Sequence, residues 1–150
     1  MTAGILLGDL AIFGDRAVFL FASQDVETGA SVVVEDNGRV CYAYFREPDG
    51  KIVGDVWLYN RCEAPEELEW GRKTGGAPYA NARDYIVSPM NFALPTGKHE
   101  VSARWLLIDG ELIAEILVGD LVIGRLGAGH KPGWARAAAK NGRFAQVMLM

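Results

Sequence analysis

A glycine-rich run at residues 127–133 holds the side chains of this sequence best suited to chemistry. It reads Gly-Ala-Gly-His-Lys-Pro-Gly, so His130 and Lys131 lie within it. Backbone N–H groups and cations at the start of a helix bind phosphate and other anions. The spacing G-x-G-x-x-x-G is one residue too long for the dinucleotide fingerprint, and the Gly-Lys-Ser/Thr ending of a P-loop is missing. The run and the helix expected after it therefore predict an anion or small-ligand site at His130, Lys131, Trp134 and Arg136. The alternative is an ordinary solvated helix face.

A second group of candidates is aromatic. The segment 60–100 contains four prolines and no clear periodicity, and it carries Trp70, Tyr79, Tyr85 and Phe92. Connections of this length without regular structure are uncommon in compact domains and are often functional. We expect the segment to pack over a sheet and to present these aromatic side chains to a protein partner. The alternative is that it covers the sheet and does nothing else.

Patterns for metal binding and nucleophilic catalysis are missing. The two histidines have no ligand residue at a motif-like spacing, and Cys41 and Cys62 form no C-x-x-C pair. No serine lies in a G-x-S-x-G elbow. A nucleophile pair of Cys62 with His99 or His130 stays formally open. The sequence thus predicts no metal and no cofactor, and it favours a non-enzymatic role.

Four aromatic residues on neighbouring predicted strands, Tyr42, Tyr44, Trp57 and Tyr59, can form a stacking platform for bases or sugars. We expect Tyr42 and Tyr44 to share one face of their strand, and Trp57 and Tyr59 to share one face of theirs. The acidic residues around them are Glu35, Asp36, Glu47, Asp49 and Asp55. This charge disfavours nucleic acid, so a half-buried core or a protein-contact surface explains the group better.

Composition bounds the class of protein. The chain has 150 residues, of which 50% are hydrophobic and 23% charged, which suits one globular domain spanning 1–150. The net charge is −4, but residues 1–120 carry 19 acids against 10 basic residues, while residues 121–150 carry five basic residues and no acid. Such a split marks a partner-binding or anion-binding end, or it is an accident of strand packing.

The N-terminal residues and the cysteines bear on location. Residues 1–9 lack a basic leader, and Asp9, Asp15 and Arg16 interrupt the apolar stretch that follows. This pattern argues against a secretory signal and a membrane span. Two cysteines, one of them inside a predicted strand, are expected to be free thiols in a reducing compartment. We therefore expect a cytoplasmic protein.

Two three-stranded meanders must position these candidates. Turns at Asn37-Gly38 and Pro48-Asp49-Gly50 delimit the first meander, and Asp109-Gly110 and Gly119-Asp120 delimit the second. The predicted strands are 31–36, 39–46 and 52–59 in the first, and 101–108, 111–118 and 121–126 in the second. Further strand signals lie at 5–7, 10–13 and 144–149, with a strong one at 17–22, and helix signals lie at 133–140 and, weakly, at 64–70.

The sequence therefore predicts a mainly β fold: an antiparallel sandwich or small barrel built from the two meanders, with a short C-terminal helix. Alternation in the strand 111–118 points Leu112, Ala114, Ile116 and Val118 inward. Ile113 and Leu117 then fall on the opposite face, so we expect a second sheet, a helix or a partner chain to cover it.

Three blocks of the sequence resemble those of a set of short uncharacterised bacterial proteins. The blocks are GDVWLYN at 54–60, APYAN at 77–81 and KPGW at 131–134, and the resemblance spans roughly residues 50–145. It implies a bacterial, cytoplasmic, single-domain protein, and it carries no activity.

These observations predict a small non-enzymatic binding protein that engages a protein partner, of the immunity or inhibitor type, with a toxin as the partner. The alternative is a small-ligand or anion-binding domain, with or without enzymatic activity, centred on residues 127–136. A third hypothesis is that the protein forms a homodimer in which the face of Ile113 and Leu117 is buried. We expect no nucleic acid and no membrane among its partners.

Overall fold

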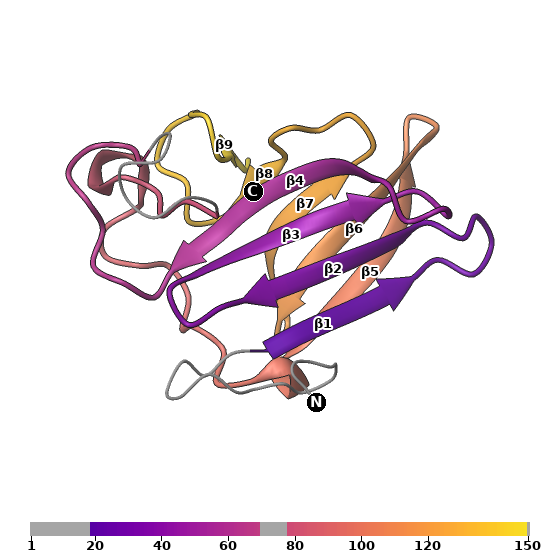
Figure 1. Ribbon diagram of the computed structural model, residues 1–150, viewed down its shortest axis with the longest axis horizontal. Helices are drawn as coiled ribbons and strands as arrows, with labels where there is room; N and C mark the ends of the chain where they lie inside the picture. Colours follow the sequence, from indigo (N-terminus) through magenta and orange to yellow (C-terminus); the bar gives the residue numbers. More distant parts are fainter. Residues whose placement is uncertain (1–18, 70–77, 150) are drawn as a thin grey trace.

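Two β-sheets packed face to face form the body of the protein (Figure 1). The computed structural model describes residues 19–69 and 78–149. The first sheet has the order β1-β2-β3-β4 and the second the order β5-β6-β7-β8-β9. Neighbouring strands are antiparallel except β8 and β9, which are parallel. The mainly β prediction is confirmed, and the described strands form a sandwich and not a closed barrel.

The strand bounds follow the predicted meanders closely. The first sheet contains β1 (Phe19–Gln24), β2 (Ser31–Asp36), β3 (Val40–Arg46) and β4 (Ile52–Asn60). The second contains β5 (Val101–Ile108), β6 (Glu111–Val118), β7 (Leu121–Gly127), β8 (Trp134–Ala135) and β9 (Gln146–Val147). Two 3-10 turns, η1 (Arg83–Tyr85) and η2 (Lys98–Glu100), lie in the connection between the sheets.

The hairpin between β5 and β6 shows why these turns form where the sequence places them. Asp109 has φ 51° and Gly110 has φ 83°, and the pair Ile108 and Glu111 closes the ladder on either side. Two consecutive positive φ angles match the right-handed twist of the strands, and an Asp-Gly pair adopts them at low cost. The turn therefore fixes the register of the second meander.

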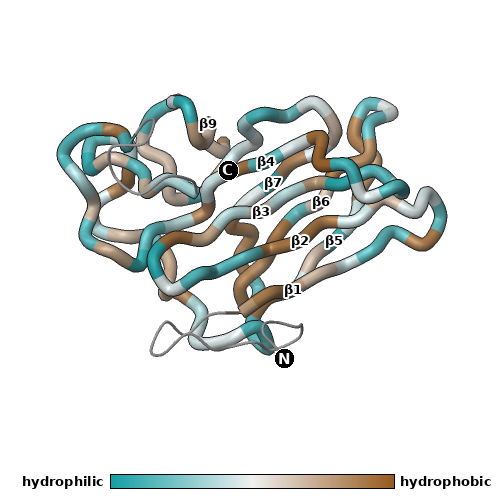
Figure 2. The backbone as a smooth tube through the Cα atoms, viewed as in Figure 1, coloured by the Kyte–Doolittle hydropathy of each residue, from teal (hydrophilic) through white to brown (hydrophobic). Residues whose placement is uncertain are grey.

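The core lies between the two sheets. Val32, Val34 and Phe45 point inward from the first sheet, where Phe45 meets Trp105 of β5 edge-on at 5.9 Å between ring centroids. Figure 2 shows apolar residues gathered along the strands, while the turns that join them are largely hydrophilic. The sheets approach each other closely beside Gly54, where an added Cβ would stand 2.4 Å from the carbonyl oxygen of Gly127. Only glycine permits that approach.

The described parts of the connection, 61–69 and 78–100, pack over the first sheet and contain no α-helix. Residues 64–69 are irregular, so the weak helix prediction is wrong there, and Trp70 lies outside the described residues. Glu69 is buried, forms an ion pair with Arg39, and accepts a 2.9 Å hydrogen bond from the Ala80 amide. These bonds hold the segment on the sheet, where Trp57 of β4 is completely buried.

The predicted C-terminal helix at 133–140 is wrong. β8 lies there, and the amides beyond it bond to distant strands and loops: Arg136 to the carbonyl of Ile123, and Ala139 to that of Tyr85. The side chains of Ala135, Ala137 and Ala138 are buried. Tertiary packing therefore overrides the helix propensity of alanine.

The remaining predicted elements have mixed outcomes. The strand expected at 144–149 is reduced to β9, and that expected at 17–22 is described from Phe19 onward. The strands expected at 5–7 and 10–13 lie outside the described residues. Within the described ranges, no helix has the length and apolar character needed to cross a membrane.

Candidate functional site

The outer face of the second sheet is covered by the chain itself. Ile113 and Leu117, predicted to need a cover, are 4% and 8% exposed, and Glu115 between them is 3% exposed. Glu115 pairs with Arg104 on β5 and with Arg125 on β7 across the sheet. A second copy of the chain is therefore not required to bury these residues.

Glu115 is clamped by two guanidinium groups. Arg104 donates to its Oε1 from Nε at 3.0 Å and from Nη2 at 2.7 Å, and Arg125 donates to Oε2 at 3.1 and 2.8 Å. Burial by itself raises the pKa of Glu115, but these hydrogen bonds outweigh burial and hold that pKa below its usual range. Glu115 is thus a structural anion held between two cations, and it is not poised for acid–base chemistry.

A hollow of about 540 Å³ lies beside this clamp, and we call it the Trp134 hollow. The β5–β6 hairpin, the loop before β8 and the strand β9 surround it. Its lining residues are Ile108, Asp109, Glu111, Ile113, Arg125, His130, Trp134, Val147 and Leu149. The hollow therefore combines an aromatic wall, an apolar floor and several charged groups.

His130 is the central polar side chain of the Trp134 hollow. Its ring meets Trp134 edge-on at 4.7 Å between centroids, and its Nε2 lies 3.6 Å from the Glu111 carboxylate. Its Nδ1 is buried and has no hydrogen-bond partner among the described residues. Two residues predicted from the glycine run, His130 and Trp134, are thus brought together.

The other two residues of that prediction lie elsewhere. Lys131 lines a separate hollow of about 290 Å³ with Tyr42, Tyr44 and Asp55 on the first sheet. Burial raises the pKa of Asp55, and the charge of Lys131 opposes that rise. Arg136 donates from Nε to the Val122 carbonyl at 2.7 Å. The four predicted groups therefore do not converge on one anion.

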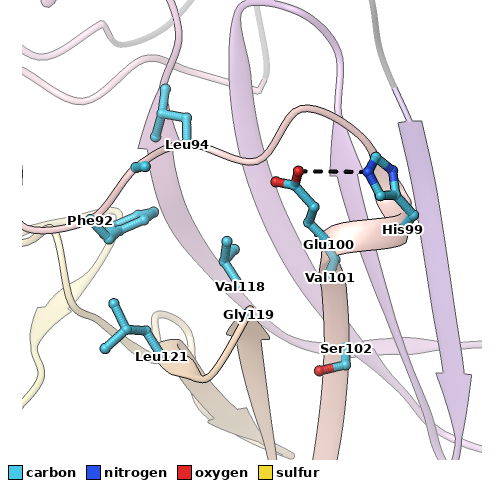
Figure 3. A pocket seen from close by; sticks show the side chains of 10 residues that line it. Phe92, Leu94, His99, Glu100, Val101, Ser102, Val118, Gly119 and Leu121 are labelled. Carbon is cyan, nitrogen blue, oxygen red and sulfur yellow. Dashed lines mark ion pairs between the residues drawn. The ribbon is translucent and has the colours of Figure 1, made fainter.

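A second apolar hollow, of about 420 Å³, opens between the loop 92–100 and the β6–β7 turn (Figure 3). We call it the Phe92 hollow. Its lining residues are Phe92, Ala93, Leu94, His99, Glu100, Val101, Ser102, Val118, Gly119 and Leu121. Phe92, Leu94, Val118 and Leu121 supply hydrocarbon surface, and Leu121 is 42% exposed.

The polar groups of the Phe92 hollow lie at one side of it, where η2 precedes β5 (Figure 3). His99 Nε2 stands 3.6 Å from Glu100 Oε2, and Thr96 bonds both Glu100 oxygens through its amide and hydroxyl. The Thr96 hydrogen bonds lower the pKa of Glu100. The hollow is therefore apolar, with one anionic side.

The predicted partner-binding aromatics are separated from one another. Phe92 meets Tyr59 edge-on at 6.2 Å, and Tyr79 stacks on Phe144 at 5.7 Å between centroids. The Lys140 ammonium lies 4.7 Å from the ring centroid of Tyr85. All three predicted aromatics are half-buried. Of the three that the structure describes, Phe92 lines the Phe92 hollow and Tyr79 and Tyr85 do not, and Trp70 is not among the described residues.

The aromatic strand platform is divided by a register shift. Tyr42 pairs with Trp57, but its neighbour Cys41 pairs with Tyr59, because the ladder shifts between Cys41 and Tyr42. Cys41 and Tyr42 are neighbours on β3, so their side chains face opposite sides of the sheet. Their partners on β4, Tyr59 and Trp57, therefore face opposite sides as well. The prediction that these two share a face is wrong.

Sequence reasoning missed a buried carboxylate inside the sandwich. Asp36 is 0% exposed and accepts hydrogen bonds from the Tyr59 hydroxyl at 2.6 Å, Arg61 Nε at 2.7 Å and the Gly38 amide at 2.9 Å. The signal was available in the alternation of β2, because Asp36 follows Val32 and Val34 at every second position.

Comparisons with protein families, curated proteins and solved structures found no match to this chain. Within residues 19–69 and 78–149, no three side chains of His, Cys, Asp or Glu lie together as metal ligands would. The site must therefore be interpreted from its own geometry.

Proposed function

We propose that this chain is a cytoplasmic, non-enzymatic binding protein of the immunity or inhibitor type, which engages a protein partner through the Phe92 hollow. The observation that carries the proposal is an open hollow of about 420 Å³ whose walls are mainly apolar. Interfaces draw much of their affinity from one or two apolar side chains seated in such pockets. Free Cys41 and Cys62 support a reducing compartment.

The charges around the hollow define the partner further. Glu100 lies on one side of the hollow and Asp120 is exposed next to its lining residues Gly119 and Leu121. Residues 1–120 carry an excess of nine acidic charges, from 19 acids and 10 basic residues. A partner that inserts an apolar side chain and surrounds it with Lys or Arg fits this surface, because complementary charge steers association.

Capture from the native host, compared between variants, tests the proposal. Tagged wild-type protein should retain one protein in stoichiometric amount. Leu121→Asp should lose it, because a carboxylate in the hollow must be desolvated on binding. Val26→Asp is the matched control, since Val26 is 88% exposed in the turn between β1 and β2 and should change nothing.

Two results would contradict the proposal: no stoichiometric partner, or a partner that Leu121→Asp retains as well as the wild type does. Thermal unfolding of both variants verifies that each is folded. For an inhibitor, the captured protein should also lose its activity when one equivalent of the wild type is added.

A second candidate function, binding of a small ligand, is favoured by a different observation. The Trp134 hollow holds His130 against Trp134, and its volume of about 540 Å³ suits a small organic molecule. This candidate does not depend on the Phe92 hollow, and each can be tested without the other.

A further inference from the structure

The charges that line the Trp134 hollow are not those of an anion site. Arg125 is its one guanidinium, and both its Nε and its Nη2 donate to Glu115. The glycine run that suggested an anion site contributes His130 to the lining, while Lys131 belongs to another hollow. Of the cationic groups predicted from the glycine run, His130 is thus the one that lines the hollow, and the hydrogen bonds of Arg125 are directed to Glu115.

Two carboxylates, Asp109 and Glu111, line the same hollow and outnumber its one guanidinium, that of Arg125. Glu111 is 65% exposed, and its one ion-pair partner among the described residues is His130, at 3.6 Å. Asp109 forms no ion pair within the described part of the chain. Both sit on the hairpin that closes one side of the hollow, because the Asp-Gly turn places Asp109 and Glu111 at its tip.

The rest of the lining is hydrocarbon and aromatic. Ile113 is buried, Ile108 is 42% exposed, and Leu149 is 84% exposed. Trp134 adds an indole whose face attracts cations. Apolar surface next to unbalanced carboxylates matches a molecule with an apolar body and a positive head.

We infer that the Trp134 hollow binds an organic cation, an ammonium or guanidinium group carried on an apolar body. The carboxylates of Asp109 and Glu111 take the positive head, and Trp134, Ile113 and Leu149 contact the body. This inference rests on the second candidate function and gives the ligand the charge opposite to the one predicted from the glycine run.

Three probes with the same hydrocarbon chain test the inference: hexylammonium, hexan-1-ol and hexanoate. Each is titrated into the full-length protein and followed by proton–nitrogen NMR of the Trp134 indole N–H, assigned with Trp134→Phe. Hexylammonium should bind about tenfold more tightly than hexanol, the difference a charged hydrogen bond makes, and hexanoate should bind most weakly.

The double substitution Asp109→Asn, Glu111→Gln should bring the affinities for hexylammonium and hexanol together while leaving that for hexanol unchanged. Asn tolerates the positive φ of 51° at position 109, and Glu111 is largely exposed, so the variant should fold. Glu27→Gln, an exposed change in the β1–β2 turn, is the control and should alter none of the three.

Hexanoate binding as tightly as hexylammonium would overturn the inference and leave a small-ligand site of the other charge. An unchanged preference for hexylammonium in the double variant would overturn it as well. If none of the three probes shifts Trp134, the inference and the second candidate function both fail. Partner binding at the Phe92 hollow is untouched by each of these results.

Discussion

The two sheets each bury a carboxylate, but they surround it differently. Asp36 of the first sheet lies inside the sandwich at 0% exposure, and Glu115 of the second lies on an outer face at 3% exposure. Asp36 is bonded by Tyr59, itself 1% exposed, and by Arg61. Glu115 is bonded by two arginines whose side chains are 55% and 32% exposed.

Burial of a charged group therefore does not by itself set how much that group contributes to the free energy of unfolding. When a carboxylate is lost, its partners either reach water or remain buried without a bond. Arg104 and Arg125 can turn outward, whereas the Tyr59 hydroxyl cannot. Asp36 should therefore contribute more to stability than Glu115, although Glu115 accepts more hydrogen bonds from arginine side chains.

The largest expected effect is that of Asp36→Asn. The variant keeps the shape of the side chain, removes the charge facing Arg61 and leaves the Gly38 amide or the Tyr59 hydroxyl without an acceptor. Breaking a buried pair in this way should lower the free energy of unfolding by about 3 kcal/mol. Urea unfolding measures the change, with Asp120→Asn in an exposed turn as the control. A loss of stability no larger than that of the control would show that the Asp36 carboxylate does not stabilise the fold.

Tyr59→Phe should have an intermediate effect. It removes the hydroxyl that donates to Asp36 at 2.6 Å and leaves Arg61 and the Gly38 amide in place. Burial raises the pKa of Tyr59, so the hydroxyl stays a donor at any pH used for the measurement. Loss of one buried hydrogen bond to a charged group should cost about 1.5 kcal/mol in urea unfolding. A cost equal to that of Asp36→Asn would mean that the carboxylate acts only through Tyr59.

Glu115→Gln should cost less, about 1 kcal/mol, because its arginine partners can recover hydrogen bonds from water. The same unfolding measurement applies, with Glu27→Gln as the exposed control. A loss as large as that of Asp36→Asn would reverse the comparison, since exposure of the partners would then be irrelevant.

The smallest expected effect is the pH dependence of the stability lost in Glu115→Gln. The pKa of Glu115 is lowered in the folded protein, while an unfolded glutamate titrates at about 4.3. The stability contributed by the charge is therefore complete above that pH and disappears as the pH falls through the lower, folded-state pKa. The difference in unfolding free energy between wild type and Glu115→Gln should be constant between about pH 7 and pH 5.5 and should shrink toward about pH 3. A difference that stays the same at about pH 3 would show that the stabilisation does not come from the charge of Glu115.

Local patterns predicted the candidate site only in part. The glycine run pointed to His130 and Trp134, which do share a hollow, because a short loop and the strand after it place neighbours close together. It also pointed to Lys131 and Arg136, which face other parts of the fold. The alanine-rich composition of residues 133–140 predicted a helix there, and the segment forms the short strand β8 followed by a turn instead.

By itself the sequence determined the strands and turns of the two meanders, since turns such as Asp109-Gly110 and the alternation of apolar residues act over a few positions. Only the tertiary structure decided that Tyr59 and Arg61 donate hydrogen bonds to Asp36, that the alanine run near Ala137 forms no helix, and that the carboxylates of one hairpin line the same hollow as Trp134. The physical reason is that these outcomes depend on which distant segments supply hydrogen bonds and apolar cover, and no local pattern encodes that choice.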